Sequence, residues 1–286
     1  MNITTDGNTI TLTGTLDQAV QRAEDAYKLG GHHGNKHLAS REEYGKTKPW
    51  AGTSHFPEAA QLARDGWHEG AKRLADLRDR LAESVGELLP ETVYMMDVTG
   101  FDVDVGAYLA GEPECMVTTA QMPGASKQIH MAVNVSNSAY VDPEAMIMRG
   151  LLAAGVVDAL EAMGHRVTLD VIIPTVNRWE NTHNNCNIIV QLKQADEVLD
   201  VERVAYACAH PSMLRRLSFG IKESLPKEWQ QGTGVGGGYG QPVDEVEFTY
   251  PDEQPDIYIG NANTASNMEQ VLDQVVQYLR DSGALS

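Results

Sequence analysis

Two apolar segments in the middle of the chain flank one long helical segment, and this arrangement restricts the fold more than any other feature. Residues 128–135 and 166–173 are rich in Val, Ile and Leu, which is typical of strands buried on both faces. Between them, Asp142 and Pro143 form an N-cap and a first-turn proline, and apolar positions recur at helical spacing to Met163. Strands joined through such a helix pair in parallel. The sequence therefore predicts an α/β fold with a mostly parallel sheet covered by helices.

The N-terminal part has a different pattern and is predicted to form its own region. Alternating residues 3–12 indicate a hairpin turned at Asp6 and Gly7. We expect helices over 17–27, from Pro57, and over 71–85, 199–209 and 266–280, with an irregular helical stretch over 211–230. Further strands are expected over 92–98, 187–192 and 256–260. The chain is thereby divided into an N-terminal hairpin and helical region at residues 1–88 and an α/β sheet domain at residues 89–286.

The charge and the apolar content exclude several classes of function. Forty acidic residues against twenty-two basic ones give a net charge of −18, which repels the phosphate backbone of nucleic acids. No apolar run approaches the roughly 18–20 residues of a membrane-spanning helix, and the first residues lack the pattern of a signal peptide. We expect a cytoplasmic protein without direct nucleic-acid or membrane binding, with Cys115, Cys186 and Cys208 reduced.

The segment Met131–Tyr140 carries the most informative motif. An apolar strand runs directly into Asn134, Ser136 and Ser138 at alternate positions, just before the capped helix. This spacing resembles the metal-ion adhesion motif of von Willebrand factor A-type domains, in which a strand ends in Asp-x-Ser-x-Ser and oxygen ligands bind one divalent cation. The alternative is a turn rich in Ser and Asn, which turn chemistry alone also favours.

The resemblance to A-type domains extends coarsely over residues 128–280 and implies a Rossmann-like or von Willebrand A-like sheet. It also implies Thr175 as a later ligand, with Asn261 or Asn263 from the loop after the final strand. In this chain Asn134 stands where the family has Asp, so a neutral amide replaces a charged ligand. Mg²⁺ is usually held through carboxylates, so this replacement weakens the expected site. We expect no resident cofactor, with Mg²⁺ as the alternative.

A second resemblance concerns most of the chain. Several Trp, Gly and Pro positions carry it, in the runs WAGT at 50–53, HF at 55–56, ARDGW at 63–67, MDVTG at 96–100, VDVG at 103–106, GEPEC at 111–115, HP at 210–211 and LRR at 214–216 with Phe219. These runs are similar to those of an uncharacterised family of tailed-bacteriophage proteins. That family brings no biochemical activity, so the resemblance implies a phage-encoded protein in the cytoplasm of the infected host cell.

Three carboxylates offer a second place for a divalent cation. Asp97, Asp102 and Asp104 lie close together in the sequence and could hold a metal for phosphoester chemistry. The alternative is a junction between strand and helix with a capping Asp, and the following Gly-Glu-Pro-Glu at residues 111–114 favours an exposed acidic turn. Three further clusters have structural interpretations. A solvated loop contains His32, His33 and His37, and buried thiols are expected among His183, Cys186, Cys208 and His210. A local cationic cluster consists of Arg215, Arg216, Lys222 and Lys227.

Three functions remain open at this point. The leading hypothesis is a non-catalytic protein-interaction module with a degraded metal-ion adhesion motif, which binds a phage or host protein through loops at the carboxyl ends of its strands. One alternative is a divalent-metal-dependent enzyme that acts on nucleotides or phosphoesters. The other is an acidic decoy that imitates DNA charge, or a structural component of the virion.

Overall fold

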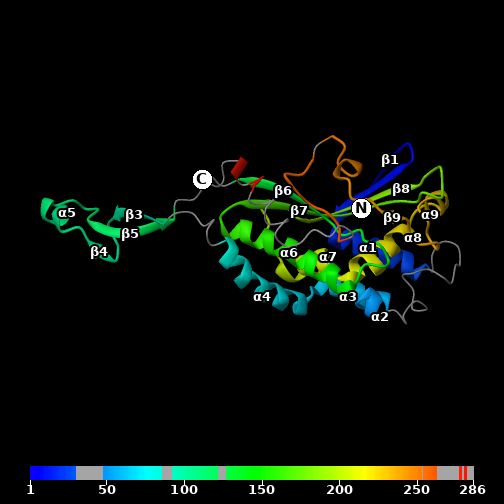
Figure 1. Ribbon diagram of the computed structural model, residues 1–286, viewed down its shortest axis with the longest axis horizontal. Helices are drawn as coiled ribbons and strands as arrows, with labels where there is room; N and C mark the ends of the chain where they lie inside the picture. Colours follow the sequence, from blue (N-terminus) through cyan, green and yellow to red (C-terminus); the bar gives the residue numbers. More distant parts are fainter. Residues whose placement is uncertain are drawn as a thin grey trace.

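The computed structural model describes residues 1–29, 48–85, 92–121, 127–252, 254–262, 277–278 and 280–281. Over these residues the chain is a mixed α/β structure, with a mostly parallel central sheet flanked by helices (Figure 1). This confirms the predicted fold class at the level of architecture. Most of the helix predicted over 266–280 lies outside the described residues, and so do His32, His33, His37 and Asn263.

In the described chain, seven strands form the central sheet: β1 (Asn2–Asp6), β2 (Thr9–Thr15), β6 (Gln128–Asn134), β7 (Arg166–Val176), β8 (Asn185–Lys193), β9 (Gln241–Pro242) and β10 (Ile257–Ile259). Their order is β1-β2-β8-β7-β6-β10, and β9 pairs with β7. Strand β6 pairs in parallel with both β7 and β10, whereas β7 and β8 are antiparallel. Because the chain leaves β6 toward β7 and later returns to its other side as β10, the order reverses at β6. Crevices at such a reversal are where open α/β sheets place their ligands.

The described helices are α1 (Leu16–Lys28), α2 (Lys48–Ala51), α3 (Phe56–Asp65), α4 (His68–Val85), α5 (Val105–Ala110), α6 (Pro143–Ala162), α7 (Val201–Ala209), the π-helix η3 (Met213–Ser218), α8 (Phe219–Glu223), α9 (Lys227–Gly232) and the 3-10 helix η4 (Val246–Phe248). Helices α1, α3, α4, α6 and α7 lie together on one side of the sheet (Figure 1). Helix α6 is buried from Gly150 to Val157 and contacts α4, α7 and β7. Within the described part of the chain, no helix is both long and apolar enough to cross a membrane.

The N-terminal hairpin belongs to the central sheet. Strand β2 pairs in parallel with β8, which places Ile10 and Leu12 in the core. The hairpin turn consists of Gly7 and Asn8, one residue later than predicted, because Asp6 still pairs with Thr9. The central sheet therefore contains strands from both sides of the boundary predicted after residue 88.

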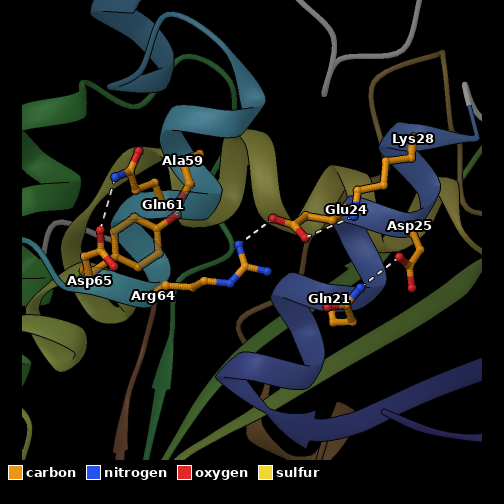
Figure 2. A network of polar contacts seen from close by, with 9 residues as sticks. Gln21, Glu24, Asp25, Lys28, Ala59, Gln61, Arg64 and Asp65 are labelled. Atoms are coloured by element: carbon orange, nitrogen blue, oxygen red, sulfur yellow. Dashed lines mark hydrogen bonds and ion pairs between the residues drawn. The ribbon is translucent and has the colours of Figure 1, made fainter.

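Helix α1 is fixed at its start and against its neighbour α3. Thr15 caps α1: its hydroxyl accepts a hydrogen bond from the Gln18 N–H, and the Gln18 side-chain oxygen accepts one from the Thr15 N–H. Figure 2 shows Arg64 of α3 pointing at Glu24 of α1, and these side chains form an ion pair with an N···O distance of 2.5 Å. The hydrogen bond from Arg64 is the main cause that lowers the pKa of Glu24. Helix α3 begins with Phe56 and Pro57, as the sequence predicts.

A small antiparallel sheet forms a unit of its own, which we call the arm (residues 92–121). It contains β3 (Thr92–Asp97), β5 (Met116–Gln121) and β4 (Asp102–Val103), paired in that order, together with helix α5. Figure 1 shows the arm extending away from the central sheet. The predicted strand over 92–98 is confirmed, and so is the junction between strand and helix given as the alternative at Asp104, whereas β5 is not foreseen by the sequence pattern.

Candidate binding site at the carboxyl ends of the strands

Asn134 ends strand β6 and is buried at the carboxyl end of the sheet. Its amide oxygen accepts hydrogen bonds from the Ser136 backbone N–H at 2.9 Å and from the Ser136 hydroxyl at 2.6 Å. Its amide nitrogen donates to the carbonyl of Val243 at 2.7 Å, the carboxylate of Asp244 at 3.1 Å and the hydroxyl of Tyr258 at 2.9 Å. The structure thus brings Asn134 and Ser136 together, and protein groups satisfy both ends of the amide. Both lone pairs of the amide oxygen are used by Ser136, so the amide is suited here to a structural role.

Asp244 joins this cluster to the strand β10. Its carboxylate accepts hydrogen bonds from the Asn261 backbone N–H at 2.8 Å and from the Tyr258 hydroxyl at 3.2 Å. Burial is the main cause that raises the pKa of Tyr258, which keeps this hydroxyl protonated as a donor. The candidate late ligand Asn261 therefore lies at the same end of the sheet and contributes its backbone. No motif in the sequence pointed to Asp244.

Thr175 on β7 makes a contact that its predicted role as a metal ligand does not include. Its hydroxyl accepts a hydrogen bond of 2.5 Å from the ammonium of Lys222 and donates at 3.4 Å to the carbonyl of Cys186. Lys222 also donates to the Tyr239 carbonyl at 2.7 Å. Burial lowers the pKa of Lys222, whose side chain is 1% exposed. A buried ammonium therefore lies beside one of the four predicted site residues.

Arg215 reaches the same region from the π-helix η3, which continues directly into α8. Its guanidinium lies 4.5 Å from the centre of the Trp50 ring and donates to the backbone carbonyls of Trp50 at 2.5 Å and Val141 at 2.7 Å. Such cation–π contacts gain strength when water is excluded. Burial lowers the pKa of Arg215 to about 10. The π-helix and α8 together present Arg215, Ser218 and Lys222 on one face.

These groups line one cavity of about 200 Å³, which we call the carboxyl-end pocket. Its polar side chains are those of Ser136, Asn137, Ser138, Thr175, Arg215, Ser218, Lys222 and Gln241, and its aromatic ones are those of Trp50, Phe219 and Tyr239. Three of the four predicted site residues, Ser136, Ser138 and Thr175, are therefore neighbours in space. The fourth, Asn134, lies directly behind Ser136.

The predicted cationic cluster is largely a buried feature. Arg215, Arg216 and Lys222 are each 1% exposed, whereas Lys227 is exposed at the start of α9. The cluster is therefore not a surface patch for phosphate backbones. Its placement could have been suspected from the sequence, because the flanking positions 213, 214, 217 and 221 are apolar and a helix over this stretch would be buried.

The three candidate carboxylates of the second cation site lie on the arm. Asp104 is the N-cap of α5, where its side chain accepts from the N–H groups of Gly106 and Ala107, which confirms the structural alternative. Asp97 and Asp102 each accept a hydrogen bond from the next N–H along the chain. Among the described residues, no group of three His, Cys, Asp or Glu side chains is placed to hold a metal ion. Cys186 and Cys208 are buried free thiols, as predicted.

The surface of the arm is the second conspicuous feature, and sequence reasoning missed it. Helix α5 has no buried residue. Its large apolar side chains Val105, Tyr108 and Leu109 are 63%, 65% and 79% exposed. Phe101 is 66% exposed, and its ring lies edge-on to that of Tyr94 on β3, with ring centres 6.3 Å apart. The acidic turn at residues 111–114 is exposed, as the sequence predicts.

Comparison with known proteins identifies a family but no activity. No curated protein and no solved structure matches this chain. The family described as Domain of unknown function (DUF7192) matches residues 14–286, which is nearly the whole chain. The buried Asn134 cluster, the carboxyl-end pocket and the arm all lie within that span, and this protein belongs to the family of domains of unknown function DUF7192.

Proposed function

We propose that this protein is a non-catalytic protein-binding module that engages its partner through the arm. The exposed apolar surface of the arm carries this proposal. Eight large apolar side chains of the arm are at least 42% exposed: Tyr94, Met95, Val98, Phe101, Val103, Val105, Tyr108 and Leu109. Exposed apolar side chains gathered in this number on one small unit point to a protein interaction site. Tyr and Phe are also side chains that interfaces favour.

The charge of the arm points to the chemistry of the partner. Residues 92–121 contain five acidic side chains, at Asp97, Asp102, Asp104, Glu112 and Glu114, and no Lys, Arg or His. Complementary charge speeds association and selects partners. We therefore propose a partner protein with an apolar groove bordered by Lys and Arg. A second copy of this chain fits less well, because its arm and its net charge of −18 repel the first.

We further propose that the likeness to A-type domains is one of architecture. The polar residues that follow β6 at alternate positions and the helix-linked parallel pair β6 and β7 support it. In this proposal Asn134 ties Ser136 to Asp244 without a metal, and the motif serves to hold the loop in place. The resemblance to tailed-phage proteins supports the infected bacterial cell as the setting.

Affinity capture with matched variants tests the proposed function. Tagged wild-type protein, the double variant Tyr108→Ser/Leu109→Ser and the control Val198→Ser are expressed in cells and recovered after crosslinking. Val198 is 93% exposed on the central domain, so its substitution changes a similar apolar surface elsewhere. We expect one stoichiometric chain with the wild type and the control, and its loss with the arm variant. Because α5 buries none of its residues, the arm variant should unfold at the wild-type temperature.

The charge of the partner is tested in the same system. Replacing Asp97 and Asp102 with Asn should weaken the purified complex and reduce the dependence of its association rate on salt.

Equal recovery of the same chain by the wild type and by the arm variant would contradict the proposal. Self-association of the wild type in light scattering, lost in the arm variant, would instead identify a second copy as the occupant.

A further inference from the structure

The carboxyl-end pocket has an unusual charge for a protein with this composition. Among the residues that line it, the charged ones are Arg215 and Lys222, and both are cations. The whole chain carries a net charge of −18. A purely cationic lining inside an acidic protein implies a ligand that the rest of the molecule would repel.

Neither cation forms an ion pair with a carboxylate of the described chain, and Asp142 acts on Arg215 only from beyond ion-pair distance. The partners that Lys222 does have are the hydroxyl of Thr175 and the carbonyl of Tyr239, which account for two of its three N–H donors. The Nε of Arg215 is buried and has no hydrogen-bond acceptor in the described structure.

Two buried cations that form no ion pair are costly, because burial removes water that would solvate them. Burial accordingly lowers the pKa of both side chains. An anion in the pocket would supply a paired negative charge and accept the remaining N–H donors. Hydrogen bonds between such cations and oxyanions are among the strongest in proteins.

The size and the electrostatic field of the protein restrict the anion. A cavity of about 200 Å³ holds one small group, and the net charge of −18 disfavours a polyanion such as nucleic acid. The hydroxyl of half-buried Ser138 lies at the same lining and offers a further hydrogen-bonding group. We propose that the carboxyl-end pocket binds a small oxyanion, a phosphate or a carboxylate, between Lys222 and Arg215. This site does not depend on the arm.

Calorimetric titration of the full chain tests this site. Sodium phosphate and sodium acetate are titrated separately at pH 7, with sodium chloride at equal ionic strength as the blank. We expect a saturable heat with one site for at least one oxyanion. A response to phosphate alone identifies a phosphate group as the ligand, and a response to acetate alone identifies a carboxylate.

Variants connect the heat to the pocket. Lys222→Met should weaken binding about tenfold or more, because a hydrogen bond to a charged group contributes about 1.5–3 kcal/mol. Ser138→Asp places a carboxylate at the lining and should abolish binding, and it keeps the test valid if Lys222→Met does not fold. Thr5→Asp, on the exposed strand β1, adds the same charge elsewhere and should bind like the wild type. The arm variant Tyr108→Ser/Leu109→Ser should also retain the heat.

Two results would overturn the oxyanion site. One is the absence of a saturable heat for both anions with the folded wild type. The other is a heat that persists unchanged in folded Ser138→Asp. The two proposals can fail separately. If the wild type captures no partner but still binds an anion, the proposed function fails and this site stands.

Discussion

The ammonium of Lys222 on α8 donates a hydrogen bond of 2.5 Å to the hydroxyl of Thr175 on β7, and both groups are buried. This contact joins a helix of the C-terminal half to the carboxyl end of the sheet. It places a positive charge at a position where the resemblance to A-type domains implied a bound cation. A protein cation thus lies beside the residue expected to bind a metal.

Replacing Thr175 tests how much the protein depends on this contact. Thr175→Val keeps the shape of the side chain but removes the acceptor, so the buried ammonium loses one of its two partners. We expect the free energy of unfolding to fall by about 1–3 kcal/mol in denaturant titrations. Thr175→Ser is the matched control, since it retains the hydroxyl. Equal stability of the Val and Ser variants would contradict the role of the hydrogen bond.

Replacing Asn134 tests the structural role of its amide. Asn134→Asp puts a carboxylate beside that of Asp244, where the wild-type amide nitrogen lies 3.1 Å away and donates. At pH 7 we expect repulsion to reduce the free energy of unfolding by about 1–3 kcal/mol. Mg²⁺ should then raise the melting temperature of the variant, because a carboxylate pair with Ser136 offers it oxygen ligands. The measurement is thermal unfolding with MgCl₂ and with NaCl of equal ionic strength. An equal rise of the melting temperature of the wild type with MgCl₂ would contradict the proposal that the Asn134 amide holds this loop without a metal.

His210 should make the protein sensitive to mild acid. Its Nδ1 accepts from the Ser212 N–H at 3.2 Å, and burial lowers its pKa from 6.5 to about 4. The folded state therefore binds fewer protons than the unfolded state between these values, so stability falls as the pH falls from about 6.5 to about 4. The loss reaches about 3 kcal/mol at most. Denaturant titrations across this range measure it.

The His210→Gln variant should lose this part of the pH dependence. His68→Gln, at an exposed position on α4, should leave it in place. An unchanged pH dependence in His210→Gln would assign the effect to other groups.

Gly150 should resist substitution because α6 and α7 approach each other closely there. A Cβ at Gly150 would clash with the carbonyl oxygen of Cys208 and with Ala209. We expect Gly150→Ala to lower the free energy of unfolding by about 1–3 kcal/mol, since the packed helices must shift apart. Gly237→Ala is the control, because the nearest atom to its added methyl group lies 3.8 Å away. Denaturant titration compares the two, and equal stability would show that the helices separate at no cost.

Much of the fold could be predicted because local chemistry decides it. Residues 128–134 and 166–176 are strands because their apolar residues suit a sheet that is buried on both faces. Pro143 begins α6, and Gly164 follows its end with a φ of 88°, a conformation that glycine adopts without strain. The capping Asp104 is another local signal that the sequence carries by itself.

The partners of these elements could not be predicted in the same way. That β2 lies beside β8 depends on which strand edge remains open once β6, β7 and β8 have paired. The strand β5 has a mixed composition, MVTTAQ, and becomes a strand only between β3 and β4. Long-range pairing of this kind leaves no periodic signal within either segment.

The amino-acid sequence by itself determined the order of most strands and helices, the cap of α5, the proline that begins α6, and the polar residues at the end of β6. The tertiary structure alone decided that Asn134 donates to Asp244, that Lys222 meets Thr175, and that the apolar side chains of the arm remain exposed. The physical reason is range. Backbone preferences and capping act over a few residues, whereas burial and charge pairing depend on segments that are distant in the chain and meet only in the folded protein.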